Sequence, residues 1–217
     1  MGILSIITPD QQFVLDQIIK NKYISKFFYF TGGTALAEYY LQHRYSDDID
    51  LFSYEKLDDK SIFAFITELS KDRYTLESRL NDVVYSFFLK NKQGDVLKVD
   101  FGNYPYRCVE KSTNVNGVRV DSLLDIAVNK LLTVSQRTGV KDFVDLYFLL
   151  QSHSLYDLME GVKIKFGVKI EPFLLSSDFL KIDSFTFLPR MIKPITLPIL
   201  KDFFHDQAKK LGQTRVE

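Results

Sequence analysis

The chain has 217 residues, 46% of them apolar, and its 28 basic side chains balance its 28 acidic ones. This length allows one large domain or two small ones, and the zero net charge argues against a strongly basic nucleic-acid-binding protein. The single cysteine, Cys108, excludes an internal disulfide, and no apolar run approaches the roughly 20 residues that span a bilayer. The N-terminus lacks a basic segment followed by a long apolar run, so we expect a cytoplasmic protein without a signal peptide or a membrane partner.

The first part of the chain alternates helical and strand-like patterns. Thr8, Pro9 and Gln11 predict the start of a helix, with Thr8 as its cap, Pro9 in the first turn and Gln11 three residues after the cap. The pattern that follows predicts a strand over 26–31, a helix over 34–42, a strand over 48–54 and a helix through 63–69. Strands are then predicted over 73–80, 82–90 and 95–101, and a hairpin turn at 91–94 joins the last two.

Beyond about residue 105 the pattern becomes mostly helical. A turn at 114–117 separates two small strands, and helices are predicted to follow from 123, over 141–150 and near 154–166, 171–181 and 197–211. We therefore predict an α+β fold, in which a mixed sheet with flanking helices occupies residues 1–110. A mostly helical C-terminal region is predicted for residues 111–217.

A glycine turn followed by an acidic strand is the strongest chemical signal. An aromatic run ends at Gly32 and Gly33, which allow a tight turn, and Thr34 then opens a helix whose first N–H groups offer an anion site. Asp48 and Asp50 share one face of a strand because residues two apart point the same way. Since Mg²⁺ prefers oxygen ligands and substrate phosphates, this arrangement suits a metal-bound nucleoside triphosphate.

A third carboxylate, Asp100, lies with Lys98 on the polar face of the predicted strand 95–101. Three carboxylates could hold two divalent ions, one orienting the triphosphate and one lowering the pKa of the attacking hydroxyl, with Asp100 as proton acceptor or metal ligand. Two alternatives stay open on the residue pattern alone. Asp48 and Asp50 could form a solvated strand end, and Asp100 could be a surface residue beside a turn at Gly102.

Two separate blocks of the sequence carry a resemblance to a known family. The first block reads Gly32-Gly33-Thr34-Ala35-Leu36-Ala37, then His43-Arg44-x-Ser46-x-Asp48-Ile49-Asp50-Leu51-Phe52. The second reads Val120-Asp121-Ser122-Leu123-Leu124-Asp125-Ile126-Ala127-Val128-Asn129-Lys130, then Arg137-x-x-x-Lys141-Asp142-x-x-Asp145-Leu146. Together they resemble the signature of the AbiEii/AbiGii-type nucleotidyltransferase toxins, members of the DNA-polymerase-β-like nucleotidyltransferase superfamily, over residues 10–150 and more loosely beyond.

The resemblance implies a role for each motif residue. The catalytic set would be Asp48, Asp50, Asp100 and Lys130, with the three aspartates binding Mg²⁺ or Mn²⁺ and the lysine reaching the phosphates as a point charge. The NTP would be bound by Gly32, Gly33, Thr34, Arg44, Ser46, Arg137, Lys141, Asp142 and Asp145. For Arg44, bracing of Asp48 is an alternative to a phosphate contact. For Lys130 the alternative is a surface lysine, and for Lys141 and Asp145 it is a structural pair one helical turn apart.

The resemblance also implies an activity. The protein would have a nucleotidyltransferase-like fold whose helical region closes the cleft, and it would move a nucleotide from an NTP to an acceptor hydroxyl with release of pyrophosphate. RNA such as tRNA is the implied acceptor, and the implied setting is a bacterial toxin–antitoxin or phage-defence system with a cognate antitoxin. The alternatives are a catalytically silent nucleotide- or partner-binding protein on the same scaffold, and a transferase that acts on a protein or a small molecule.

Overall fold

The computed structural model describes residues 5–213 and divides into two compact units. Unit 1 extends to Tyr40 and resumes over Ser46–Ser122, whereas unit 2 comprises Leu41–Tyr45 and the chain from Leu123 onward. The boundary predicted after residue 110 therefore precedes the last two strands of unit 1. That the helical region closes a cleft stays a prediction.

Unit 1, in the described part of the chain, contains a seven-stranded mixed sheet with the strand order β3-β4-β5-β2-β1-β7-β6. The strands are β1 (Phe28–Thr31), β2 (Ile49–Ser53), β3 (Thr75–Leu80), β4 (Val84–Lys90), β5 (Val96–Asn103), β6 (Thr113–Val115) and β7 (Val118–Val120). The helices are α1 (Pro9–Lys20), α2 (Lys22–Phe27), α3 (Gly32–Leu36) and α4 (Asp59–Ser70), and a π-helical turn, η1 (Ala37–Leu41), follows α3. β2 lies parallel to β5 and β1 parallel to β7, while the other neighbouring strands are antiparallel.

Side-chain caps explain where the first helices begin. The Thr8 hydroxyl accepts the Gln11 N–H, and the Gln11 side chain accepts the Thr8 N–H, so the predicted helix start is confirmed. The prediction of a strand from residue 26 is wrong, because the Asn21 side chain accepts the N–H groups of Tyr23 and Ile24 and starts α2. A side-chain cap at this position overrides the strand preference of the aromatic residues that follow, and β1 begins only at Phe28.

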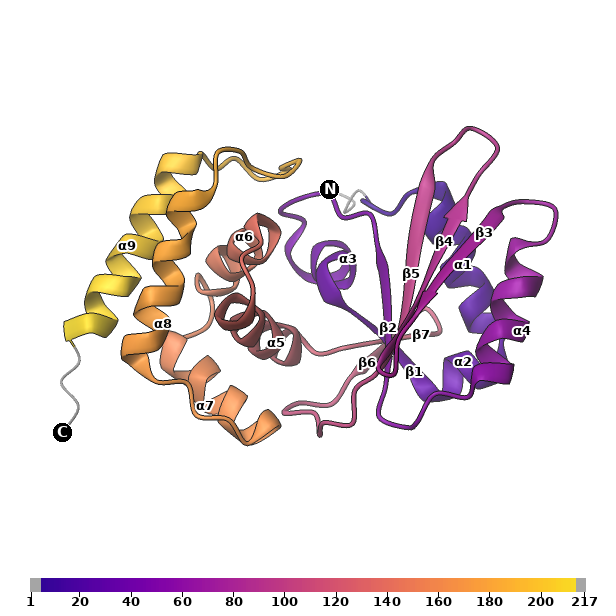
Figure 1. Ribbon diagram of the computed structural model, residues 1–217, viewed down its shortest axis with the longest axis horizontal. Helices are drawn as coiled ribbons and strands as arrows, with labels where there is room; N and C mark the ends of the chain where they lie inside the picture. Colours follow the sequence, from indigo (N-terminus) through magenta and orange to yellow (C-terminus); the bar gives the residue numbers. More distant parts are fainter. Residues whose placement is uncertain (1–4, 214–217) are drawn as a thin grey trace. The chain divides into compact units, whose positions relative to one another are not determined.

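The two faces of the sheet differ in what covers them. Val99 and Phe101 of β5 are fully buried, and the Phe101 ring contacts Phe28 of β1 and Phe65 of α4. Figure 1 shows α1, α2 and α4 on this side of the sheet and the short α3 on the other. Because side chains alternate along a strand, Asp100 projects from the face that α1, α2 and α4 leave open.

Unit 2 is helical, as predicted from the sequence. Its elements are α5 (Leu123–Gln136), α6 (Val140–Leu149), α7 (Leu155–Phe166), α8 (Pro172–Phe179), the 3-10 helix η2 (Leu180–Ser184) and α9 (Leu197–Gln213). Phe204 of α9 forms the centre of its core, with ring centroids 4.9 Å from Phe143 and 5.1 Å from Phe179. None of the helices in residues 5–213 has both the length and the apolar character needed to cross a membrane.

Candidate active site

Strand register brings two of the predicted carboxylates together. β2 and β5 are parallel neighbours in which Asp50 pairs with Asp100. The flanking pair Ile49 and Val99 is fully buried on the opposite face, so Asp50 and Asp100 project from the same face of the sheet. Asp48 lies in the segment directly before β2 rather than inside the strand, which begins one residue later than predicted.

Lys98 stands beside this acidic pair. Its Nζ donates a hydrogen bond to Asp100 Oδ2 at 2.5 Å, while the buried Oδ1 of Asp100 has no hydrogen-bond partner among the described residues. Partial burial works to lower the pKa of Lys98, but the hydrogen bond to Asp100 and the charges of Asp100, Asp48 and Asp50 outweigh it and raise the pKa above its usual range. Asp48, Asp50, Asp100 and Lys98 are called the acidic face below.

Gly32 is required by the acidic face for two reasons. Its φ of +76° lies in the left-handed region, which favours glycine. In addition, a Cβ at this position would lie only 2.0 Å from Asp50 Oδ2. The glycine turn therefore lets the backbone approach the carboxylate as closely as it does. α3 begins at Gly32 rather than at Thr34 as predicted, and after Leu36 it continues as a π-helical turn.

Other predicted phosphate-binding residues hold the segment before β2 in place. The buried Thr34 donates its hydroxyl to the backbone carbonyl of Asp48, which ties the glycine turn to the acidic segment. The carbonyl of Ser46 accepts a hydrogen bond of 3.0 Å from Gln11 Nε2. Gly33 is half-buried next to the turn. The structure thus places Gly32, Gly33, Thr34 and Ser46 in unit 1 with the acidic face.

The remaining predicted residues gather in unit 2 around a different carboxylate. Asp145 is fully buried, and Arg44 reaches it with Nε at 2.6 Å and a terminal nitrogen at 2.8 Å. Lys130 Nζ lies 2.7 Å from the same carboxylate, and so does His43 Nε2. The sequence-based alternative of a surface lysine at position 130 is wrong, because only 9% of Lys130 is exposed.

Asp142 extends this group toward the surface. It accepts hydrogen bonds from Lys130 Nζ and from Arg137 Nε, both at 2.8 Å. The side chain of Arg137 is 68% exposed, and Lys141 is exposed next to Asp142. His43, Arg44, Lys130, Arg137, Asp142 and Asp145 are called the ion cluster below. The predicted roles of Arg44, Arg137, Lys130, Lys141, Asp142 and Asp145 in binding the triphosphate stay predictions.

Charge pairing shifts the pKa values in the ion cluster. Burial works to raise the pKa of Asp145, but the charges of Lys130 and Arg44 outweigh it and hold that pKa well below its usual range. The pKa of Asp142 is lowered in the same way, against burial, by Lys130 and Arg137. Burial lowers the pKa of His43, so its Nε2 donates to Asp145 as a neutral ring.

Two residues of these groups had no role in the sequence reasoning. His43 stands in the first sequence block without a role, and its position next to Arg44 is the signal that the two side chains can share a partner. Lys98 was placed only on the polar face of its strand. Its spacing of two residues from Asp100 was the signal that the two side chains can pair.

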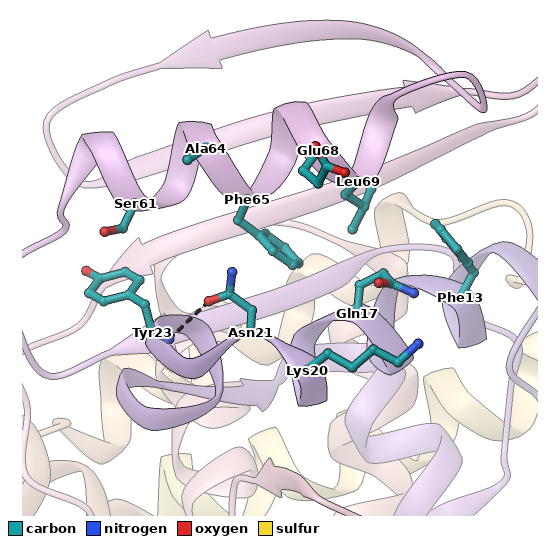
Figure 2. A pocket seen from close by; sticks show the side chains of 10 residues that line it. All are labelled: Phe13, Gln17, Lys20, Asn21, Tyr23, Ser61, Ala64, Phe65, Glu68 and Leu69. Carbon is teal, nitrogen blue, oxygen red and sulfur yellow. Dashed lines mark hydrogen bonds between the residues drawn. The ribbon is translucent and has the colours of Figure 1, made fainter.

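The pocket in Figure 2 lies elsewhere in unit 1. It has a volume of about 440 Å³ and is lined by residues of α1 and α4 and of the start of α2, with Phe65 projecting into it from α4. A second pocket of about 690 Å³ includes Asp47 and Leu97, which directly precede two members of the acidic face. Neither pocket contains Asp48, Asp50 or Asp100.

Comparison with known proteins decides the family. The model of the family described as "Nucleotidyl transferase AbiEii toxin, Type IV TA system" matches residues 14–211. The chain belongs to this family. The resemblance inferred from the two sequence blocks is therefore confirmed.

A curated relative matches part of the chain. A protein of Aquifex aeolicus (strain VF5) named "Uncharacterized protein aq_aa25" is 37% identical over 141 residues, which are 63% of this chain and 64% of that protein. The match therefore spans less than two thirds of the length of that relative.

Solved structures share the fold at low sequence identity. JHP933 from Helicobacter pylori aligns with a TM-score of 0.57 at 19% identity, covering 93% of this chain and 90% of that one. MenT4, the nucleotidyltransferase toxin Rv2826c from Mycobacterium tuberculosis H37Rv, aligns with a TM-score of 0.60 at 14% identity, covering 95% and 85%. At these identities the likeness shows the fold alone, and the predicted nucleotidyltransferase-like fold is confirmed.

Proposed function

We propose that the protein is a metal-dependent nucleotidyltransferase that moves a nucleotide from an NTP to an acceptor hydroxyl. The observation that carries the proposal is the pairing of Asp50 with Asp100 on one face of the sheet, next to Gly32, whose backbone approaches Asp50 as only a glycine can. Membership of the AbiEii family supports the reaction class.

The donor set of the acidic face fits a divalent cation. Within residues 5–213 no three His, Cys, Asp or Glu side chains are already arranged as a metal site, and Lys98 Nζ donates to Asp100 Oδ2. However, Asp100 Oδ1 is buried without a hydrogen-bond partner among those residues, and buried polar atoms normally have one. Asp48, Asp50 and Asp100 would hold Mg²⁺ or Mn²⁺, both of which prefer such oxygen ligands. The bound ion would polarise the phosphates and lower the pKa of the attacking hydroxyl.

The residues of unit 1 account for the rest of the proposed reaction. The acceptor oxygen forms a bond to the α-phosphorus, the bond from that phosphorus to the β-phosphate oxygen breaks, and pyrophosphate leaves. Asp100 would serve either as a ligand of the ion or as the acceptor of the proton of the acceptor hydroxyl. The half-buried turn at Gly32 and Gly33 leaves room for phosphate oxygens to approach the backbone.

The acceptor and the biological partner belong to the proposal as well. We propose a cognate antitoxin protein as the partner, because the family is described as the toxin of a type IV toxin–antitoxin system. As the acceptor we propose RNA such as tRNA, which is what the resemblance of the two sequence blocks implies. The zero net charge is compatible with RNA only through a local basic surface, and it fits a protein or small-molecule acceptor equally well. The experiment must therefore identify the labelled product and not merely detect transfer.

The proposal is tested by incubating the protein with α-labelled NTPs, Mg²⁺ or Mn²⁺, and total RNA. We expect labelled RNA with wild type and a loss of at least about a hundredfold with Asp50→Asn, because metal binding contributes several kcal/mol to such transition states. Asp47→Asn is the matched control, since Asp47 is an exposed carboxylate in the same segment.

Each outcome of this assay has a defined meaning. Unchanged transfer by Asp50→Asn would show that the site assignment is wrong. Label in protein or in a small molecule would replace the acceptor but keep the reaction. Absence of transfer by wild type with every NTP, both metals and each acceptor class would leave a silent binding protein on this scaffold.

A further inference from the structure

Lys98 is the member of the acidic face that the proposed reaction does not use. We propose that Lys98 is a resident cation of the metal site that competes with the divalent ion for Asp100 and thereby sets the metal affinity. The inference rests on the proposed function, because it assumes that Asp100 is a metal ligand.

The position of Lys98 follows from strand geometry. Lys98 and Asp100 are two residues apart on β5 and therefore share a face. Lys98 directly precedes Val99, the register partner of Ile49, and Asp48 directly precedes Ile49. Lys98 and Asp48 thus occupy equivalent steps on neighbouring segments, and the ammonium contacts Asp100, the register partner of Asp50.

The hydrogen bond shows which ligand atom Lys98 controls. The ammonium engages Asp100 Oδ2, while Oδ1 of the same carboxylate is buried and has no partner in the described part of the chain. A divalent ion that uses Oδ2, alone or together with Oδ1, must first displace the ammonium, and an ion on Oδ1 alone is still repelled by the ammonium on the same carboxylate. Asp48, Asp50, Asp100 and Lys98 together carry a formal charge of two negative units, which one divalent ion balances.

The ammonium of Lys98 can also move away from Asp100. About a third of its side chain is exposed, and its four-carbon stem allows the ammonium to move into solvent. A partly exposed ion pair of this kind contributes little to the stability of the fold. Lys98 is therefore a positioning residue for Asp100 whose main effect should fall on metal binding.

The experiment measures Mn²⁺ binding without NTP, by electron paramagnetic resonance of the free ion, on the full-length protein. We expect Lys98→Met to lower the dissociation constant for Mn²⁺ about tenfold, because a charge-assisted hydrogen bond no longer has to be broken. Lys90→Met is the matched control, since Lys90 is an exposed lysine at the end of the neighbouring strand β4, and we expect it to leave the constant unchanged.

A second pair of variants tests whether the effect passes through Asp100. In the Asp100→Asn background, Lys98→Met should no longer tighten Mn²⁺ binding, since the competition is for that carboxylate. Lys98→Gln keeps a polar end without the charge, and we expect it to tighten Mn²⁺ binding as Lys98→Met does. This second variant keeps the test valid if the methionine variant folds poorly.

The outcomes separate this inference from the proposed function. If wild type binds Mn²⁺ and Lys98→Met binds it equally or more weakly, the competition is disproved and the metal site stands. If Lys98→Met tightens binding just as much in the Asp100→Asn background, the effect is general electrostatics and the inference is wrong. If neither wild type nor Lys98→Met binds Mn²⁺ at millimolar concentration, the metal site fails and the inference fails with it.

Discussion

The acidic face of unit 1 and the ion cluster of unit 2 use the same kind of residue in opposite ways. On the acidic face, one carboxylate oxygen of Asp100 is held by Lys98 and the other is buried without a partner among the described residues. In the ion cluster, both oxygens of Asp145 are held by Arg44. Lys130 contacts Asp145 as well and also pairs with Asp142.

This difference means that the acidic face can bind an added cation, whereas Asp145 in the ion cluster is already paired with the cationic side chains of Arg44 and Lys130. A buried carboxylate whose partners are complete stabilises its surroundings, because removing it would leave buried positive charges uncompensated. A carboxylate with an unfilled oxygen beside other acids stores repulsion that a bound ion relieves. The comparison therefore predicts that substitutions of Asp145 act mainly on stability and that substitutions of Asp100 act mainly on cation binding.

The largest expected effect is on stability in unit 2. Asp145→Ala should lower the free energy of unfolding by about 3–5 kcal/mol, because Arg44 would lose its buried counter-charge and Lys130 would keep only Asp142. Asp50→Ala, at a half-buried position of the acidic face, should lower it by no more than about 1 kcal/mol. Guanidinium denaturation followed by circular dichroism measures both. Equal losses for the two variants would contradict the comparison.

A smaller effect tests how closely the backbone is fitted to the acidic face. Gly32→Ala should cost about 3 kcal/mol and weaken Mn²⁺ binding, because the new Cβ adds a collision with Asp50 Oδ2 to the left-handed strain. Gly94→Ala is the matched control, as Gly94 has a φ of +96° but nothing within 4 Å of the added Cβ.

The control isolates the collision from the strain. Gly94→Ala should cost only about 1–2 kcal/mol, the usual penalty of the left-handed conformation, and should leave Mn²⁺ binding unchanged. If both variants have the same cost and the same Mn²⁺ affinity, the close approach of Gly32 to Asp50 has no functional meaning.

The smallest effect is the pH dependence of the ion cluster. Because burial lowers the pKa of His43, the folded state binds a proton less readily than the unfolded chain, whose histidine titrates near about 6.5. Stability from this residue is therefore present above about pH 6.5 and is lost as the pH falls through the folded pKa, by at most about 1.4 kcal/mol per pH unit. Denaturation at pH 7 and pH 5 should show a flatter response in His43→Gln than in wild type or in His205→Gln, an exposed control.

The acid limb of the same profile reports on the aspartates. The pKa values of Asp142 and Asp145 are lowered in the folded state, so their contribution is present above the unfolded value of about 3.9 and is lost as the pH falls through the folded values. Asp145→Asn should flatten the response below about pH 4 and not between pH 7 and pH 5. If the pH dependence of the free energy of unfolding were the same in His43→Gln and Asp145→Asn as in wild type, the pKa values of His43 and Asp145 would not be shifted by folding.

Much of the site was predictable because it depends on local patterns. Spacing by two residues places Lys98 and Asp100 on one face of a strand. The pair Gly32-Gly33 after an aromatic run indicates a tight turn, because glycine readily adopts the backbone conformation that such a turn needs. The start of α2 was missed because one capping side chain, Asn21, outweighs the strand preference of the residues after it.

The sequence by itself determined the family, the mixed sheet followed by helices, and the identity of the acidic and basic motif residues, because short-range periodicity and residue order carry this information. Only the tertiary structure decided which charges are paired. Strand register joined Asp50 to Asp100 across 50 residues, and the packing of the segment after η1 with α6 joined Arg44 to Asp145 across 101. Such partnerships depend on how distant segments pack together, and the spacing of residues along a single segment does not encode them.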